Sequence, residues 1–340
     1  MGDVTKIEWC DYTFNPWVGC SKVHAGCANC YAEADFDKRR HFAQWGPHGT
    51  RVKTSAANWA KPPKWNRRDH RCMNCGKLCF REGVHPNEVR SQCCNANAVP
   101  VRPRVFCASL ADVFEDWDGP VYDSKGNVLF RSDGGRVGPM AAHHSHERIV
   151  QLTMANLRRE LFALIDATPN LDWLLLTKRP QNIRRMWVDE KIPWRATGQW
   201  HRDNVYLLTS ISDQPTADAM IPELLKCRDL ARVLGVSLEP QLGPIDITWW
   251  VNQGLGWVIV GGESGPGARP CQVGWIRSIV EQCRVADVRC FVKQLGAEPR
   301  PSALPCDVRV RAIRDKKGGN PQEWPEDLRV REFPRIESEA

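Results

Sequence analysis

Three cysteines in the segment GCSKVHAGCANCY, namely Cys20, Cys27 and Cys30, have the residue type and spacing to hold a metal centre. Thiolates are the ligands of iron–sulfur clusters and of many zinc sites. Three of them can hold three corners of a [4Fe–4S] cluster and leave the fourth iron open to another ligand. Gly19 and Gly26 give the loop the backbone freedom to wrap a cluster. We therefore predict a [4Fe–4S] cluster on this triad.

Two other interpretations of the triad stay open. A structural zinc site normally takes four ligands, and either His24 or Cys10 could supply the fourth. Alternatively, the three thiols only pack in the core as small apolar groups. The cluster is favoured because the triad follows the first predicted strand, and active sites of parallel barrels lie at the C-terminal ends of strands.

A second group of cysteines lies in residues 69–100 and is better explained by zinc. Its first two members are spaced as C-x2-C, which is a common thiolate pair in zinc sites. The predicted ligands are Cys72, Cys75, Cys93 and Cys94, with Cys79 or His85 as substitutes for one of the adjacent pair. A zinc ion held by this group could stabilise the fold of the insertion or form part of a nucleic-acid-binding surface. Alternatively, the group could hold a second iron–sulfur cluster.

The strands and helices that must position these groups are predicted to alternate along the chain. Apolar runs rich in Val, Ile and Leu are typical of strands buried on both faces of a parallel sheet. Strands are predicted at 16–20, 105–110, 173–177, 205–211, 233–238, 257–260 and 290–292, and helices at 149–167, 217–226 and 274–284. We predict an α/β fold, a partial or irregular (βα) TIM-like barrel of about six to seven parallel strands with a small Cys-rich metal-binding insertion.

The domain boundaries follow from where this pattern is interrupted. Residues 1–68 and 101–306 are predicted to form the barrel, and 69–100 the zinc-like insertion. Residues 118–146 lack periodicity and are predicted to be a surface insertion or lid, while 307–340 form a charged C-terminal extension.

The composition of the chain indicates its class and its cellular compartment. The 340 residues are 42% hydrophobic and 26% charged, which is ordinary for a soluble globular protein. No apolar run approaches the roughly 20 residues of a membrane span, and no secretory signal is visible, so we expect a cytoplasmic protein without a membrane partner. Fifteen cysteines in that reducing compartment indicate metal binding rather than disulfides.

The net charge of +7 raises the question of a nucleic-acid partner. Lysines and arginines alternate with Trp59 and Trp65 in residues 51–68, which suits phosphate contacts combined with base stacking. A solvated basic face is the alternative, because Lys and Arg are mostly exposed in any protein.

Several long motifs resemble a known family. They are NPWVGC, GCANCYAE, TSAANWAKPPKWNR, RVFCASLADVF, LDWLLLTKRPQNI, GVSLEPQLGPID, WVIVGGESGPGARP, FVKQLG and KKGGNPQEWPEDLRVREFP. Together they resemble the phage- and prophage-encoded three-cysteine proteins long catalogued as a domain of unknown function, a family similar to radical S-adenosylmethionine (SAM) enzymes. In this chain six residues, rather than the superfamily's three, separate the first two cysteines. Asn29 occupies the position before the third cysteine where the superfamily has an aromatic residue, and Tyr31 follows it.

The resemblance implies a radical SAM-type enzyme that cleaves SAM reductively to an adenosyl radical. Acting on a nucleic acid or nucleotide, it would modify or repair bases, in the host cytoplasm if the chain is phage-encoded. An electron donor of the flavodoxin or ferredoxin type and a genome-neighbour protein are the implied partners. A zinc-dependent nucleic-acid-binding protein without catalysis and a cluster-bearing regulator are the alternatives.

Polar residues at the predicted strand ends are the candidates for the remaining roles, although Ser, Thr and Asp there could simply cap helices. Candidates for SAM contacts are Tyr31, Ser210, Ser237, Glu239, Gly261, Gly262, Glu263 and Arg269. Candidates for binding an anionic substrate or donating protons are Lys178, Asp112 and Lys293, together with Arg269.

Overall fold

The computed structural model describes residues 5, 7–67, 69–72, 74, 78–79, 98–142, 148–187 and 201–334. The chain divides into two compact units. The first comprises Met1–Val18, Arg51–Ala111 and Asp118–Leu175, and the second comprises Gly19–Thr50, Asp112–Trp117 and Leu176–Ala340. The cysteine triad and most of the predicted strand-end residues therefore belong to the second unit.

A seven-stranded sheet of mixed α/β architecture is the main feature, and its strand order is β1-β7-β12-β13-β14-β15-β17. The strands are β1 (Tyr12–Thr13), β7 (Arg104–Cys107), β12 (Asp172–Thr177), β13 (Arg202–Ile211), β14 (Ala231–Leu238), β15 (Trp257–Gly261) and β17 (Arg289–Gln294). The paired strands run parallel, as predicted. The order is open from β1 to β17, which agrees with a partial rather than a closed barrel.

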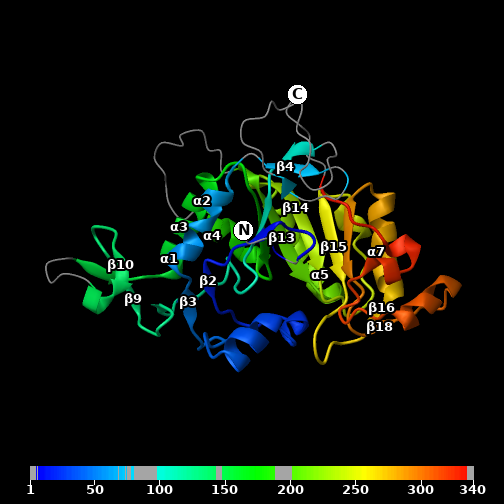
Figure 1. The fold of residues 1–340 in the computed structure, drawn as a ribbon, viewed down its shortest axis with the longest axis horizontal. Coiled ribbons are helices and arrows are strands. Elements are labelled where there is room, and N and C mark those ends of the chain that lie inside the picture. The colour runs from blue at the N-terminus through cyan, green and yellow to red at the C-terminus, as the bar shows by residue number, and fades with distance from the viewer. Residues whose placement is uncertain are drawn as a thin grey trace. The chain divides into compact units, whose positions relative to one another are not determined.

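In the second unit, β13, β14, β15 and β17 are parallel neighbours that can be followed from green to orange in Figure 1. Val236 of β14 is in register with Val258 of β15, and Ile259 of β15 with Phe291 of β17. These side chains are almost completely buried, and consecutive residues point to opposite faces of a strand. Both faces are therefore covered, which explains the uninterrupted apolar runs in the sequence.

Two helices of the second unit pack against these strands. Helix α5 (Gln214–Leu225) packs against β13 and β14, and α7 (Val273–Val285) packs against β15 and β17. Both were predicted within a few residues. The buried residues of α7 recur every three or four positions and so form one apolar face; they are Val273, Ile276, Ile279 and Cys283.

In the first unit, one strand prediction is wrong. The run at 16–20 was expected to be the first parallel strand, but β1 occupies that place, with Tyr12 in register with Val105. The apolar run instead forms β2 (Trp17–Val18), which pairs antiparallel with β3 (Arg51–Lys53) in a separate sheet with β8 (Val121–Tyr122). The same short buried pattern satisfies either type of pairing, so the sequence alone does not distinguish them.

The start of helix α3 (Met154–Asp166) also differs from the prediction of 149–167. Thr153 caps this helix through a capping box with Asn156, which fixes the helix start after Leu152. Residues Ile149–Gln151 form β11 instead, in a sheet with β9 (Leu129–Ser132) and β10 (Val137–Pro139). The 118–146 segment thus contains short strands where no regular element was predicted.

The cysteine-rich insertion is described only in part. Strand β4 (Asp69–Cys72) pairs antiparallel with β5 (Leu78–Cys79) and β6 (Ala98–Val101). Cys75, His85, Cys93 and Cys94 lie outside the described residues, so the predicted zinc ligands there remain a prediction.

The remaining elements are short. In the first unit they are α1 (Ala56–Trp59), α2 (Lys61–Trp65) and η3 (Met140–Ala142). In the second unit they are η1 (Ala25–Cys27), η2 (Glu33–Arg39), η4 (Pro180–Asn182), α4 (Ile183–Trp187), α6 (Thr248–Val251), β16 (Cys271–Gln272), β18 (Pro299–Arg300), η5 (Pro305–Ala312), η6 (Pro321–Glu323) and η7 (Glu326–Leu328). Among the helices described, none has the length and apolar character needed to span a bilayer.

Candidate functional site

The three cysteines of the triad lie on one loop of the second unit, residues 19–32, which we call the cysteine loop. Its centre is the single turn η1, capped by His24, whose Nδ1 accepts a hydrogen bond from the Gly26 amide at 3.1 Å. The Cys27 amide donates to the His24 carbonyl at 2.9 Å. Cys27 is buried, while Cys20 and Cys30 are half-buried. The loop therefore has regular local structure that does not depend on its thiols.

One end of the cysteine loop is held by Arg179. The guanidinium donates to the Ser21 carbonyl at 2.8 Å and approaches the Cys20 thiol at 3.7 Å. It also pairs with Asp112 at 2.9 Å and Glu115 at 3.3 Å, and Glu115 accepts from the Ser21 amide at 2.9 Å. A buried cation with two buried carboxylates thus fixes the backbone beside the first cysteine.

Asp112, a predicted proton donor, is occupied by this structural role. Its carboxylate accepts from the Thr177 hydroxyl at 2.7 Å, the Lys178 amide at 3.0 Å and the Phe114 amide at 3.0 Å, in addition to Arg179. The acceptor capacity of this carboxylate is therefore used within the protein.

The other end of the loop is held by Glu263 and Arg269. Arg269 donates through two nitrogens to the Glu263 carboxylate, at 2.6 and 2.9 Å, and through a third to the Ala25 carbonyl at 2.9 Å. The Asn29 amide donates to Glu263 at 3.0 Å and to the Gly267 carbonyl at 3.0 Å. Burial alone would raise the pKa of Glu263, but the bonds from Arg269 and Asn29 hold that pKa below its usual value. The predicted pair Glu263 and Arg269 therefore contacts the cysteine loop directly.

Between these two anchors, the loop passes close to Ser212. A Cβ on Gly26 would lie 2.1 Å from the Ser212 hydroxyl oxygen, so only glycine allows this approach. The Ser212 hydroxyl and His24 Nε2 are both buried without a hydrogen bond in normal geometry. Unpaired buried polar atoms are costly, and two of them beside one loop mark a place where a ligand could bond.

Two titratable groups of the loop, Cys20 and His24, lie in different electrostatic environments. Burial, together with the negative charges of Glu115 and Asp112, raises the pKa of the Cys20 thiol to about 12, although Arg179 opposes this rise. Burial and the positive charge of Lys178 lower the pKa of His24 to about 4, so its imidazole is neutral at neutral pH. A thiol in this setting needs a cation, such as a metal, to become a thiolate.

A second polar cluster lies at the C-terminal ends of strands β14 and β17. The Lys293 amine pairs with the Glu239 carboxylate, which also accepts from the Gln294 amide at 3.3 Å. Ser210 and Ser237 are buried and in register with one another, and the Ser210 hydroxyl donates to the Glu239 carbonyl at 3.4 Å. The structure thus brings these predicted residues together, with the Lys293 amine paired with the Glu239 carboxylate.

Gly261 and Gly262, predicted to approach a ligand, are explained by packing against the chain itself. A Cβ on Gly262 would lie 2.3 Å from the Leu295 carbonyl oxygen, and one on Gly261 would lie 2.9 Å from the Gln294 carbonyl oxygen. These glycines allow the end of β15 to lie close to the end of β17. No ligand is required to account for them.

The structure also places three other residues named from the sequence. Tyr31, a candidate for contacting SAM, is 60% exposed. Trp65 is buried and stacks on Tyr12 with ring centres 4.5 Å apart, so its ring is not available to a base. Lys178 is half-buried, and its amine makes no hydrogen bond or ion pair with any residue that the structure describes.

Metal-binding geometry is absent from the described ranges: no group of three or more His, Cys, Asp or Glu side chains is arranged to hold a metal ion. The cysteine loop brings the triad onto one anchored segment but not into a coordination geometry.

Glu115 is the site residue that sequence reasoning missed. It lies in a loop with no periodicity, and only its buried contacts with Arg179 and Ser21 identify it. Arg179 and Ser212 also follow predicted strands, but their contacts with the cysteine loop have no signal in the sequence.

Comparison with known proteins gives one match. The family described as "Protein of unknown function (DUF5131)" matches residues 4–121 and 143–323, a span that includes the whole cysteine loop and every anchor described above. No curated protein and no solved structure matches the chain significantly. Because the matched residues make up well over half of its length, the chain belongs to the DUF5131 family of proteins of unknown function.

Proposed function

We propose that the chain is a radical SAM-type enzyme in which Cys20, Cys27 and Cys30 hold a [4Fe–4S] cluster. The observation that carries this proposal is the anchoring of the cysteine loop at both ends. Arg179 holds the backbone next to Cys20, and Arg269 with Glu263 holds it between Ala25 and Asn29. Loops that hold three ligands for one cluster need this kind of support from their surroundings.

The residues present fit such a group in their donor chemistry. The loop offers three thiols, and two buried polar atoms beside them, His24 Nε2 and the Ser212 hydroxyl oxygen, have no hydrogen-bond partner in normal geometry. His24 Nε2 and the Ser212 hydroxyl could each bond to a ligand at the cluster. When bound, the cluster and SAM supply reductive cleavage of SAM and hydrogen abstraction from a substrate.

The protein's own residues have separate tasks in this proposal. Arg179 offsets the negative charge of Asp112 and Glu115 next to Cys20, which favours the thiolate form that a metal requires. Glu263, Arg269 and Asn29 fix the other half of the loop. Their hydrogen bonds leave the Glu263 carboxylate as a positioning group. Glu239 is a candidate for contacts with SAM, and Lys293, which pairs with it, is a candidate for binding an anionic substrate or donating a proton.

Lys178 is the candidate for binding a negatively charged substrate. Its amine has no partner among the described residues, and its charge acts on the neighbouring imidazole of His24. A free cation beside the cysteine loop suits a phosphate, which agrees with a nucleotide or nucleic-acid substrate in base modification or repair. An electron donor of the flavodoxin or ferredoxin type and a genome-neighbour protein complete the proposal as partners.

Anaerobic reconstitution tests the proposal. We expect about four iron atoms per chain, a visible absorption band, and 5′-deoxyadenosine after reduction in the presence of SAM. The triple Cys20→Ala, Cys27→Ala, Cys30→Ala variant should lose all three signals. The matched control is Cys227→Ala, a buried cysteine in the turn after α5, which should retain them.

The alternatives give different results in the same experiment. A cluster that forms without any 5′-deoxyadenosine indicates a regulator, and zinc without iron indicates a nucleic-acid-binding protein. Iron content that is equal in the triple variant and in the unaltered protein refutes the assignment of the triad. Zinc on Cys72, Cys75, Cys93 and Cys94 is a separate proposal, and a metal titration of the triple variant isolates it.

A further inference from the structure

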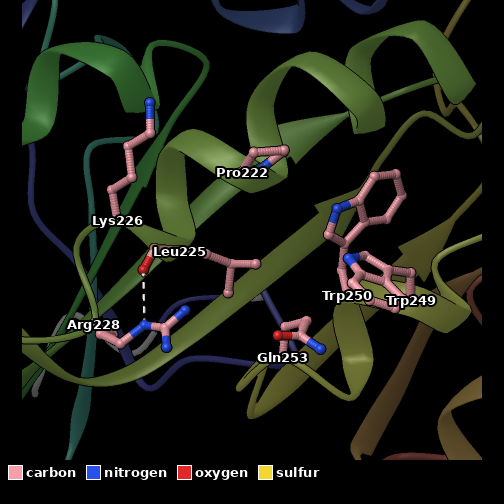
Figure 2. A pocket seen from close by; sticks show the side chains of 7 residues that line it. All are labelled: Pro222, Leu225, Lys226, Arg228, Trp249, Trp250 and Gln253. Atoms are coloured by element: carbon pink, nitrogen blue, oxygen red, sulfur yellow. Dashed lines mark hydrogen bonds between the residues drawn. The ribbon is translucent and has the colours of Figure 1, made fainter.

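A surface cavity of about 410 Å³ lies in the second unit, between the C-terminal end of α5 and the short helix α6. It is lined by Pro222, Leu225, Lys226, Arg228, Trp249, Trp250 and Gln253 (Figure 2). Helix α5 ends before β14, and α6 comes before β15, so the cavity is next to the N-terminal ends of these strands. The cysteine loop contacts residues that follow the C-terminal ends of strands, at the opposite edge. The cavity is therefore separate from the candidate site.

An exposed indole is the first unusual feature of this cavity. Trp249 is 72% exposed, more than any other large hydrophobic side chain among the described residues. Trp250 lies beside it, and Pro222 with Leu225 supplies an apolar surface between the indoles and the cations (Figure 2). A large flat ring left in water at the rim of a cavity is available for stacking with another planar group.

A free cation is the second feature. Arg228 uses only its Nε, which donates to the Leu225 carbonyl at 3.1 Å, and no carboxylate pairs with it in the described part of the chain. Lys226 is exposed and forms an ion pair with Glu223 at 2.6 Å. Figure 2 shows both cations on one side of Leu225 and the two indoles on the other. The terminal nitrogens of Arg228 can thus form the forked contact that matches a phosphate.

We propose that this cavity binds single-stranded nucleic acid, with a base stacked on Trp249 and the adjacent phosphate held by Arg228. Aromatic platforms next to cations are how proteins bind single strands without reading sequence. An acidic peptide would use the cation but not the exposed indole, and a proline-rich peptide would use the indole but not the cation. The cavity is broad and open to solvent, which suits one nucleotide of a strand that continues past it. The proposal does not depend on the reaction proposed above.

Fluorescence anisotropy of a labelled oligodeoxythymidylate of about ten nucleotides tests the proposal with the full chain. Trp249→Ala should weaken binding by about 5- to 150-fold, and Trp249→Phe should recover part of the loss because a ring remains. Arg228→Gln should weaken binding and reduce the slope of log affinity against log salt by about 0.7, the value for one phosphate contact on a single strand. The control is Arg284→Gln on α7, an exposed arginine paired with Glu281, which should leave binding within twofold of the unaltered protein.

The outcomes separate the proposal from its competitors. Binding that Trp249→Ala leaves within twofold refutes it, provided that circular dichroism shows the variant folded. Equal competition by polyglutamate or by a polyproline peptide also refutes it and identifies a peptide site. A duplex that binds as tightly as the single strand refutes the stacking role of Trp249, because paired bases are not free to stack on it. If Trp249→Ala loses binding while Cys20, Cys27 and Cys30 are unchanged, the result supports the nucleic-acid site at this cavity and leaves the proposed reaction at the triad untouched.

Discussion

The Arg179 side chain offers the sharpest test of how the cysteine loop is held. Its guanidinium is only 11% exposed and contacts Asp112, Glu115 and the Ser21 carbonyl. The two carboxylate side chains are 6% and 4% exposed, so water cannot replace the cation. Arg179→Met keeps much of the length and apolar volume of the side chain and removes only the charge and its hydrogen bonds.

The expected loss of stability follows from what remains after the substitution. Breaking a buried ion pair by removing one partner typically costs about 3–5 kcal/mol, because the other charge stays buried and unpaired. Asp112 keeps its bonds from Thr177 and Phe114, and Glu115 keeps its bond from Ser21, which places the estimate near the lower end. We expect Arg179→Met to lower the free energy of unfolding by about 3 kcal/mol. Arg179→Lys retains the charge but not the forked geometry, and should cost about 1–2 kcal/mol.

A nearby exposed pair provides the matched control. Arg185 donates to Asp116 at 2.9 Å, the same distance as Arg179 to Asp112, but the two side chains are 58% and 68% exposed. Exposed pairs contribute about 0–1 kcal/mol and weaken with salt. Arg185→Met should therefore be nearly neutral, although distance alone would rank the two pairs as equal.

Equilibrium urea unfolding of both variants, followed by circular dichroism at about 0.1 M and about 1 M sodium chloride, measures the difference. The loss for Arg179→Met should persist at high salt, because buried charges are little screened. A loss below about 1 kcal/mol, or one that disappears in salt as for Arg185→Met, would refute the reasoning.

Two further predictions address other parts of the chain. Gly262→Ala should lower the free energy of unfolding in urea by about 1–3 kcal/mol, because its Cβ would lie 2.3 Å from the Leu295 backbone oxygen. The control is Gly243→Ala, where a Cβ meets nothing within 4 Å and stability should change by about 0.5 kcal/mol or less. Equal effects of the two substitutions would contradict the packing role of Gly262. Asp11 in the first unit accepts from Arg71 at 2.9 Å and from the Arg104 amide at 2.8 Å, and its pKa lies below the ordinary 3.8 despite burial, which alone would raise it. Since the unfolded chain takes up this proton first, the contribution of the carboxylate is complete above 3.8 and lost as the pH falls through the native pKa. Asp11→Asn should therefore cost about 2–3 kcal/mol near pH 7 and less near pH 3 by urea unfolding, and a cost independent of pH would count against the ion pair.

The parallel strands were predictable from the sequence because burial on both faces produces uninterrupted apolar runs. Six of the seven predicted strands overlap strands of the main sheet, and α5 and α7 begin and end within a few residues of their predicted bounds. The run at 16–20 failed because two or three buried residues look the same whether their partner is parallel or antiparallel. The open or closed state of a barrel depends on the pairing of its edge strands, which no local pattern encodes.

The candidate site was predictable only in its residue types. The sequence indicated that Glu263, Arg269, Glu239 and Lys293 follow strands, and the structure shows that they pair with one another in two ion pairs. Those partners are chosen by the meeting of strand ends in space, so spacing along the chain does not reveal them. Glu115 had no sequence signal at all, because a lone acidic residue in an irregular loop is usually solvated.

Anchoring by Arg179 and Glu263 separates the conformation of the cysteine loop from the chemistry of its thiols. The contacts that fix the loop mainly use the Ser21 amide and carbonyl, the Ala25 carbonyl and the Asn29 side chain. The Cys20 thiol adds one longer contact, at 3.7 Å from Arg179. The close approach of Gly26 to Ser212 likewise involves only backbone and a hydroxyl. Removing a thiol therefore leaves the support of the loop in place, whereas removing Arg179 leaves the thiols in place and withdraws the support. Substituting the thiols should therefore abolish metal binding while the support of the loop remains, whereas substituting Arg179 should lower stability and also disfavour the Cys20 thiolate. Iron content and unfolding measured on both kinds of variant separate the two effects.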